Sequence, residues 1–136
     1  MGVFKVILLD THVWIWWLSH PDKLSKKALA AINSAIPATV VYISSISIWE
    51  IAVLVKKGRL QLRIDVSDWI KHAESLPFFY FVPVNNHIAI KSVYLKGELH
   101  DDPADRIIIA TAMTTGASLV TKDERMHIYK HVDTIW

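Results

Sequence analysis

Short apolar runs alternate along this chain with longer segments whose apolar residues recur at helical spacing. The first run covers Lys5 to Leu9, is unbroken after its lysine, and ends abruptly in a carboxylate, Asp10. Such a run is typical of a strand buried on both faces, as in a parallel sheet covered by helices. Similar β-branched or aromatic runs predict strands at 39–43, 78–82 and 117–121, and an edge strand at 132–136.

Helical periodicity predicts the segments between these strands. The predicted helices cover residues 12–19, 25–34, 46–57, 66–76, 85–99 and 107–115, with a short helix after a turn at 122–125. The helix at 46–57 is apolar nearly all round, which predicts that it is buried. Strands that alternate with helices imply right-handed crossovers. We therefore predict an α/β fold, a three-layer α/β/α sandwich with a central parallel sheet.

Composition narrows the class of protein. The chain has 136 residues, which suits one domain spanning 1–136, and its 52% hydrophobic and 21% charged residues exclude a disordered chain. No apolar run approaches the roughly 20 residues that span a bilayer, and no secretory signal precedes the first strand. The absence of cysteine excludes disulfides and cysteine-ligated zinc. We expect a soluble, cytoplasmic protein with no membrane partner.

Several aspartates have two possible roles, a structural one in a cap or turn and ligand binding. Asp10 and Asp123 follow predicted strands, and Asp102 and Asp105 flank Pro103 at the start of a helix. Each fits a structural role as a helix cap, a first-turn acid or a turn residue. Capping accounts for Asp102, whereas ligand binding stays open for the other three. In open α/β sheets the ligand crevice lies outside the carboxyl ends of the strands, where Asp10 and Asp123 are predicted.

Glu50 is different because it lies in the middle of a helix with almost no polar face. An unpaired buried carboxylate is costly, so Glu50 either pairs with a lysine or arginine or joins other acids around a metal ion. Asp10, Glu50, Asp105 and Asp123 are all predicted near one edge of the sheet. Four carboxylates there repel one another unless a divalent cation neutralises them.

Oxygen ligands of this kind favour Mg²⁺ or Mn²⁺ as the cofactor. Zinc is not indicated, because the sequence has no HExxH motif and no Cys/His grouping. His12 and His100 lie close in sequence to the proposed ligands, and we expect hydrogen-bonding or surface roles for both. The Gly-rich phosphate loop, the dinucleotide fingerprint and the nucleophile elbow are all missing.

The net charge of +2 is too small to predict a nucleic-acid binder by itself, although it is compatible with a local basic rim. Six basic residues are candidates for phosphate contacts, with a solvated surface role as the alternative for each: Lys56, Lys57, Arg59, Lys122, Arg125 and Lys130. The cluster of Trp14, Trp16 and Trp17 cannot point all its rings into the core, so part of it is expected at an interface.

Four blocks of the sequence together resemble the PIN domain, and most closely the VapC toxins of prokaryotic toxin–antitoxin pairs. The blocks are Leu8-Leu9-Asp10-Thr11-His12, Ile43 to Ile51 (ISSISIWEI), His100 to Ala110 (HDDPADRIIIA) and Leu119-Val120-Thr121-Lys122-Asp123. They occur in the family's order, with fitting spacing, over nearly the whole chain. Ala104 departs from the pattern, because relatives often carry Phe there, and this concerns local packing rather than catalysis.

The resemblance implies a metal-dependent endoribonuclease with RNA as its substrate, a homodimer, and a cognate antitoxin that inhibits it. By position, Asp10, Glu50 and Asp105 match the three core acidic ligands, and Asp123 matches the fourth, weaker acid. Thr11, Ser45 and Thr121 fall where small hydroxyls could support those acids.

Two alternatives compete with the nuclease. One is a catalytically silent module that keeps the fold for dimerisation or partner binding; metal titration discriminates, because a silent module has no reason to bind Mn²⁺ specifically. The other is a phospho-accepting receiver domain, which also gathers acids at strand ends. A receiver needs paired acids after its first strand and an acceptor after its third, and Phe81-Val82-Pro83 offers none.

Overall fold

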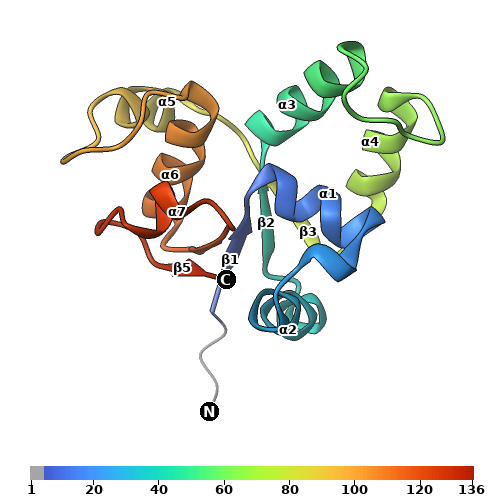
Figure 1. Cartoon of the computed structure of the whole chain (residues 1–136), viewed down its shortest axis with the longest axis horizontal. Helices are drawn as coiled ribbons and strands as arrows, with labels where there is room; N and C mark the ends of the chain where they lie inside the picture. Colours follow the sequence, from blue (N-terminus) through green and yellow to red (C-terminus); the bar gives the residue numbers. More distant parts are fainter. Residues whose placement is uncertain (1–4) are drawn as a thin grey trace.

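Five parallel strands form the centre of the molecule. The structure is a computed structural model that describes residues 5–136 (Figure 1); residues 1–4, on which the expectation of no secretory signal partly rests, lie outside that range. The strands are β1 (Ile7–Leu9), β2 (Val41–Ser44), β3 (Phe79–Val82), β4 (Ser118–Val120) and β5 (Thr134–Ile135), in the order β3-β2-β1-β4-β5. Leu9 of β1 pairs with Ile43 of β2 and Val120 of β4. The segments that follow these three strands therefore leave the sheet at one edge.

Helices cover both faces of the sheet. They are α1 (Thr11–Ser19), α2 (Lys26–Ala35), α3 (Ser45–Lys56), α4 (Val66–Ser75), α5 (Asn86–Val93), α6 (Pro103–Thr115) and α7 (Glu124–His127), with short 3-10 helices η1 (Pro21–Lys23) and η2 (Ile36–Ala38). In Figure 1, α5, α6 and α7 lie on one side of the strands and α1 to α4 on the other. Among residues 5–136 no helix is both long enough and apolar enough to cross a membrane.

Alternate side chains of β1 supply the two halves of the core. Leu8 packs with Ile108 and Ile109 of α6, whereas Leu9 belongs to the cluster on the opposite face with Trp14 and Ile32. All these side chains are fully buried, as expected for a central strand with helices on both faces. The predicted three-layer α/β/α sandwich with a parallel sheet is confirmed.

The prediction that the helix at 46–57 is buried is wrong. Within α3 only Ser47 and Ile51 are buried, and Trp49 is 59% exposed. This helix contacts α1, α4 and α6, and those contacts cover only part of its circumference. A helix that is apolar all round therefore presents an apolar surface to solvent.

The helix predicted at 85–99 ends early, because α5 stops at Val93. The guanidinium of Arg106 donates hydrogen bonds to two carbonyls at the end of this helix and to two in the loop that precedes α6, and Gly97 of that loop adopts φ +79°. A single side chain thus takes the place of the next helical turn. The loop it shapes leads directly into α6.

Candidate active site

Asp10 occupies the first position after the central strand, where it begins α1. Its carboxylate accepts hydrogen bonds from the Thr11 amide at 2.9 Å and from the Thr121 hydroxyl, which follows β4, at 2.8 Å. The residue is 8% exposed. Burial raises the pKa of Asp10 above its ordinary value of 3.8, the Thr121 hydrogen bond opposes that shift, and the charge of Asp105 adds to it. Capping and placement at the sheet edge thus coexist in one residue.

Glu50 approaches Asp10 from α3 through shared hydroxyls. Thr11 donates from its hydroxyl to Oε1 of Glu50 at 2.5 Å, and the Ser47 hydroxyl lies 2.8 Å from the same Thr11 oxygen. Because the Thr11 proton goes to Glu50, Ser47 donates to Thr11. Desolvation raises the pKa of Glu50, the Thr11 bond opposes this, and the charges of Asp10 and Asp105 reinforce it. No lysine or arginine among residues 5–136 forms an ion pair with Glu50.

Asp105 comes from the first turn of α6 and faces His100. Nε2 of His100 lies 2.6 Å from Oδ2 of Asp105, and the two side chains are 15% and 16% exposed. Burial raises the pKa of Asp105, the hydrogen bond from His100 opposes the shift, and the charge of Asp102 adds to it. Nδ1 of His100 is buried, and no atom of residues 5–136 forms a hydrogen bond with it. We infer that Nε2 carries the proton and donates it to the carboxylate.

Arg106 fixes the backbone around this histidine. Its guanidinium donates to four backbone carbonyls, those of Ser92 (2.9 Å), Val93 (3.3 Å), Leu99 (3.1 Å) and His100 (3.4 Å). The first two belong to the end of α5, and the last two precede α6. Asp102 accepts from the Asp105 amide at 2.9 Å and so caps α6, as the capping interpretation predicted.

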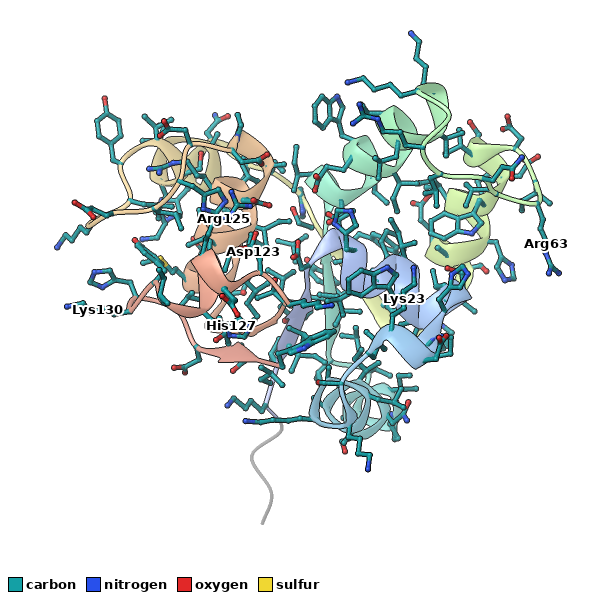
Figure 2. The ribbon with its side chains drawn as sticks, in the orientation of Figure 1. Lys23, Arg63, Asp123, Arg125, His127 and Lys130 are labelled. Atoms are coloured by element: carbon teal, nitrogen blue, oxygen red, sulfur yellow. The ribbon has the colours of Figure 1, made fainter. Side chains whose placement is uncertain are left out.

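Asp123 differs from Asp10 and Glu50 because an arginine, Arg125, binds it closely. Figure 2 labels both residues of this pair. Arg125 binds Asp123 with two bonds, Nη2 to Oδ2 at 2.8 Å and Nε to Oδ1 at 3.1 Å, and also lies 3.8 Å from Asp105. Hydrogen bonding from Arg125 lowers the pKa of Asp123. Asp123 also caps α7 through the Arg125 amide at 2.9 Å. Its turn is tied to Asp10, because the Asp123 amide donates to the same Thr121 hydroxyl.

The four predicted acids line one cavity of about 490 Å³ at the carboxyl edge of the sheet. Its complete lining is Asp10, His12, Val13, Trp16, Glu50, Asp102, Asp105, Lys122, Asp123 and Arg125. Of the six basic candidates, Lys122 and Arg125 reach this cavity, and the other four are exposed elsewhere. Thr11 and Thr121 support the acids as the resemblance implied.

Sequence reasoning missed two contributors. Ser45 was named as a supporting hydroxyl, but the described contacts give that role to Ser47, which lies on the same helical face as Glu50. The spacing of those two residues could have indicated it. His100 was assigned only a general hydrogen-bonding or surface role, and its pairing with Asp105 depends on the loop held by Arg106.

The donor set fits a hard divalent cation. Within residues 5–136, Asp10 and Glu50 form no ion pair with a lysine or arginine. With Asp105 they are partly or fully removed from water, an arrangement that a positive ion would stabilise. Ligand atoms of His100, Asp105 and Asp123 also lie within 4.8 Å of one another. Carboxylate oxygens suit Mg²⁺ or Mn²⁺.

Known proteins resemble this chain over nearly its whole length. Residues 7–132 match the family model described as the PIN domain. Ribonuclease VapC22 of Mycobacterium tuberculosis is 38% identical over 133 residues, covering 96% of this chain and 98% of the relative. A toxin–antitoxin complex from Klebsiella pneumoniae contains a chain with TM-score 0.63 and 24% identity, covering 93% of this chain and 94% of that one. VapBC2 from Rickettsia felis, bound to a promoter DNA fragment, gives TM-score 0.68 and 17% identity, with coverage of 96% and 97%.

Proposed function

Because this chain belongs to the PIN domain family, we propose that it is a metal-dependent endoribonuclease and the toxin of a toxin–antitoxin pair. The observation that carries the proposal is the acidic cavity, where the pKa values of Asp10, Glu50 and Asp105 are all raised. In the described part of the chain, no lysine or arginine forms an ion pair with Asp10 or Glu50. The name of the mycobacterial relative supports RNA as the substrate. The toxin–antitoxin origin of the similar structures supports the biological setting.

In this proposal Asp10, Glu50 and Asp105 hold Mg²⁺ or Mn²⁺, with Asp123 as a fourth acid. The bound ion would polarise the scissile phosphate and lower the pKa of a bound water. The protein's own contribution is orientation: Thr121 and the Thr11 amide fix the Asp10 carboxylate, and the Thr11 hydroxyl fixes that of Glu50. Side chains held in this way need little rearrangement when the ion binds.

Two cations of the cavity are placed to receive the RNA backbone. Lys122 and Arg125 line the same hollow as the acids, and each can neutralise a phosphate next to the scissile one. Arg125 is 60% exposed, so its guanidinium can exchange Asp123 for a phosphate without leaving solvent. The local basic rim that a net charge of +2 permits would therefore consist of few residues.

The Asp10→Asn variant tests the nuclease directly. Loss of a residue that only hydrogen-bonds a metal ligand typically lowers metal affinity or activity by about 10-fold to 100-fold. Loss of a ligand itself should therefore reduce Mn²⁺-dependent cleavage of a mixed RNA pool by at least about 100-fold. The fold should be as stable as wild type or more so, because charge repulsion is relieved while hydrogen bonding to Thr121 and Thr11 remains feasible. Cleavage is followed by gel electrophoresis with Mg²⁺, Mn²⁺ or EDTA, and stability by thermal unfolding.

Asp65→Asn is the matched control. Asp65 caps α4 through the Ser67 amide, as Asp10 caps α1, but it does not line the cavity. Its cleavage rate should equal that of wild type. Full specific activity of folded Asp10→Asn would contradict the assignment, and so would metal-independent cutting. Absence of both Mn²⁺ binding and cleavage in wild type would favour the silent module.

We further propose a cognate antitoxin protein and a second copy of this chain as partners, and the cytoplasm as the location. Exposed apolar residues at the end of α5 support the need for partners: Ile90, Val93 and Tyr94. Isolated exposed apolar residues are ordinary, but three at helical spacing form a continuous stripe. Co-purification of the toxin with the product of a neighbouring gene, and the molar mass of the isolated protein, test these partners.

A further inference from the structure

A second hollow adjoins the acidic cavity at one shared lining residue. Both are lined by Lys122; the second, of about 440 Å³, is completed by Glu124, His127, Ile128 and Trp136. Trp16 lines the first cavity together with the carboxylates. We call the combined surface of Trp16, Lys122 and Trp136 the tryptophan groove. In Figure 2, His127 lies on the α7 segment, and Lys23 lies on the segment that follows α1.

Two aromatic rings form the wall of this groove. The ring centroids of Trp16 and Trp136 are 6.2 Å apart, with an interplanar angle of 59°. The ring centroid of His12 lies 6.0 Å from that of Trp16. Trp16 and Trp136 are only partly buried, in contrast to Trp14, which is fully enclosed in the core. The Trp14/Trp16/Trp17 cluster therefore has one member whose ring faces the site.

Cations gather at the same wall. The ammonium groups of Lys122 and Lys23 lie 5.8 Å and 5.9 Å from the Trp16 ring centroid. Both lysines are exposed, and long flexible side chains of this kind can leave the ring to meet a phosphate. Glu124 is the acid among the residues that line the second hollow. The groove thus combines aromatic surface with mobile positive charge and opens onto the carboxylates.

We propose that the tryptophan groove binds single-stranded RNA beside the scissile bond, with a base stacked on the Trp16–Trp136 wall and Lys122 and Lys23 on the flanking phosphates. This rests on the proposed nuclease function and names its substrate class. Stacking on aromatic side chains combined with a basic track is how proteins hold single strands. Bases inside a duplex are already stacked on one another and do not reach such a wall.

A thermodynamic cycle between a side chain and a base tests the proposal. The probe is a fluorescein-labelled single-stranded RNA chosen from a random pool because wild type cleaves it with Mn²⁺. Affinity is measured by anisotropy with Ca²⁺ in place of Mn²⁺, and cleavage separately with Mn²⁺. Trp16→Leu should weaken binding by about 5-fold to 100-fold, the range for loss of one stacked base, and should raise KM more than it lowers kcat.

An abasic site moved along the RNA identifies the stacked base. At one position near the cut, the abasic site should weaken RNA binding by the wild type as much as Trp16→Leu does. RNA binding by Trp16→Leu should not weaken further when the RNA carries the abasic site at that position. Trp49→Leu is the matched control, since Trp49 is an exposed tryptophan that lines neither hollow. Lys122→Gln should reduce the dependence of affinity on salt.

The outcomes separate the two proposals. If wild type cleaves RNA but Trp16→Leu and Trp136→Leu bind and cut like Trp49→Leu, the groove proposal is overturned and the nuclease stands. The groove proposal would also be overturned if the wild type preferred duplex RNA, or if the effects of Trp16→Leu and of the abasic site were additive. A Trp16→Leu variant that changed only in oligomeric state would overturn it as well. If wild type cuts no RNA, the proposed function itself fails.

Discussion

At the scale of residues, the site separates carboxylates that need a cation from one that has it. Asp10 and Glu50 are held by hydroxyl and amide donors, which orient them without neutralising their charge. Asp123 is neutralised by Arg125 and has a lowered pKa. The first group is prepared for a metal ion, whereas Asp123 must exchange its arginine before it can contribute. Its proposed role as the weaker fourth ligand has a physical basis in that exchange.

His100 belongs to the same scale, and we predict that it orients Asp105 for metal binding. Its Nε2 occupies one carboxylate oxygen, Oδ2, which leaves Oδ1 for the ion. His100→Leu removes the donor and should weaken Mn²⁺ binding by about 10-fold to 100-fold. His100→Gln keeps an N–H group on a side chain of similar reach and should restore most of that affinity. Calorimetric titration with Mn²⁺ measures both variants without reference to cleavage.

Thermal unfolding of the two variants controls for structural damage, since Arg106 holds the surrounding loop in each. Equal Mn²⁺ affinity in wild type and His100→Leu would refute this role. Direct ligation by His100 is a different result: glutamine would then fail to restore binding, and nitrogen hyperfine coupling to Mn²⁺ would be visible by electron spin resonance.

At the scale of elements, the end of α5 carries an exposed apolar stripe. Ile90, Val93 and Tyr94 are each at least 62% exposed. If a second copy packs there, Ile90→Glu combined with Val93→Glu should convert the dimer to a monomer, because carboxylates would lose their hydration in the interface. Light scattering coupled to size exclusion measures the mass.

Trp49→Glu, on α3, is the control for this element. A double variant that stays dimeric would exclude the α5 stripe as the dimer surface. A wild type that is monomeric at micromolar concentration would remove the homodimer from the proposal altogether. Circular dichroism of the double variant distinguishes dissociation from unfolding.

The elements also show what the sequence could and could not predict. The strands, the sheet and the meeting of Asp10 with Asp123 followed from local patterns, because the carboxyl ends of parallel strands share one edge. The early end of α5 did not follow, since it depends on Arg106, which comes later in the chain and bonds to its carbonyls. The exposure of Trp49 was equally hidden, because hydrophobicity does not say whether the neighbouring helices reach far enough to cover a helix.

At the scale of the whole molecule, the acidic centre makes stability depend on pH and metal in opposite directions. The pKa values of Asp10, Glu50 and Asp105 are raised in the folded state, so the folded protein takes up protons at higher pH than the unfolded chain does. The three ionised carboxylates destabilise the folded protein, and this destabilisation is complete at pH values above their raised pKa values. It is relieved as the pH falls through the raised pKa values toward the ordinary values of 3.8 and 4.5.

We therefore predict that, without metal, the free energy of unfolding rises as pH falls from neutrality toward the ordinary carboxylate pKa values of 3.8 and 4.5. Mn²⁺ needs the deprotonated carboxylates, so the stabilisation it adds should shrink over the same interval. Urea denaturation with EDTA or with excess Mn²⁺ at several pH values measures both trends. The Asp10→Asn variant should flatten each of them. A metal-free protein that loses stability steadily from neutrality downward would contradict the prediction.

The pair of Asp123 and Arg125 makes the site respond to ionic strength in two senses. Arg125 is 60% exposed, so salt screens its attraction to Asp123 and leaves that carboxylate freer to bind the metal ion. In the proposed complex, the same salt would weaken the contacts of Lys122 and Arg125 with an RNA backbone, because the release of counterions then contributes less to binding. Salt would therefore act on the fourth acid and on the substrate in opposite directions, and the proposed turnover would be greatest at an intermediate salt concentration.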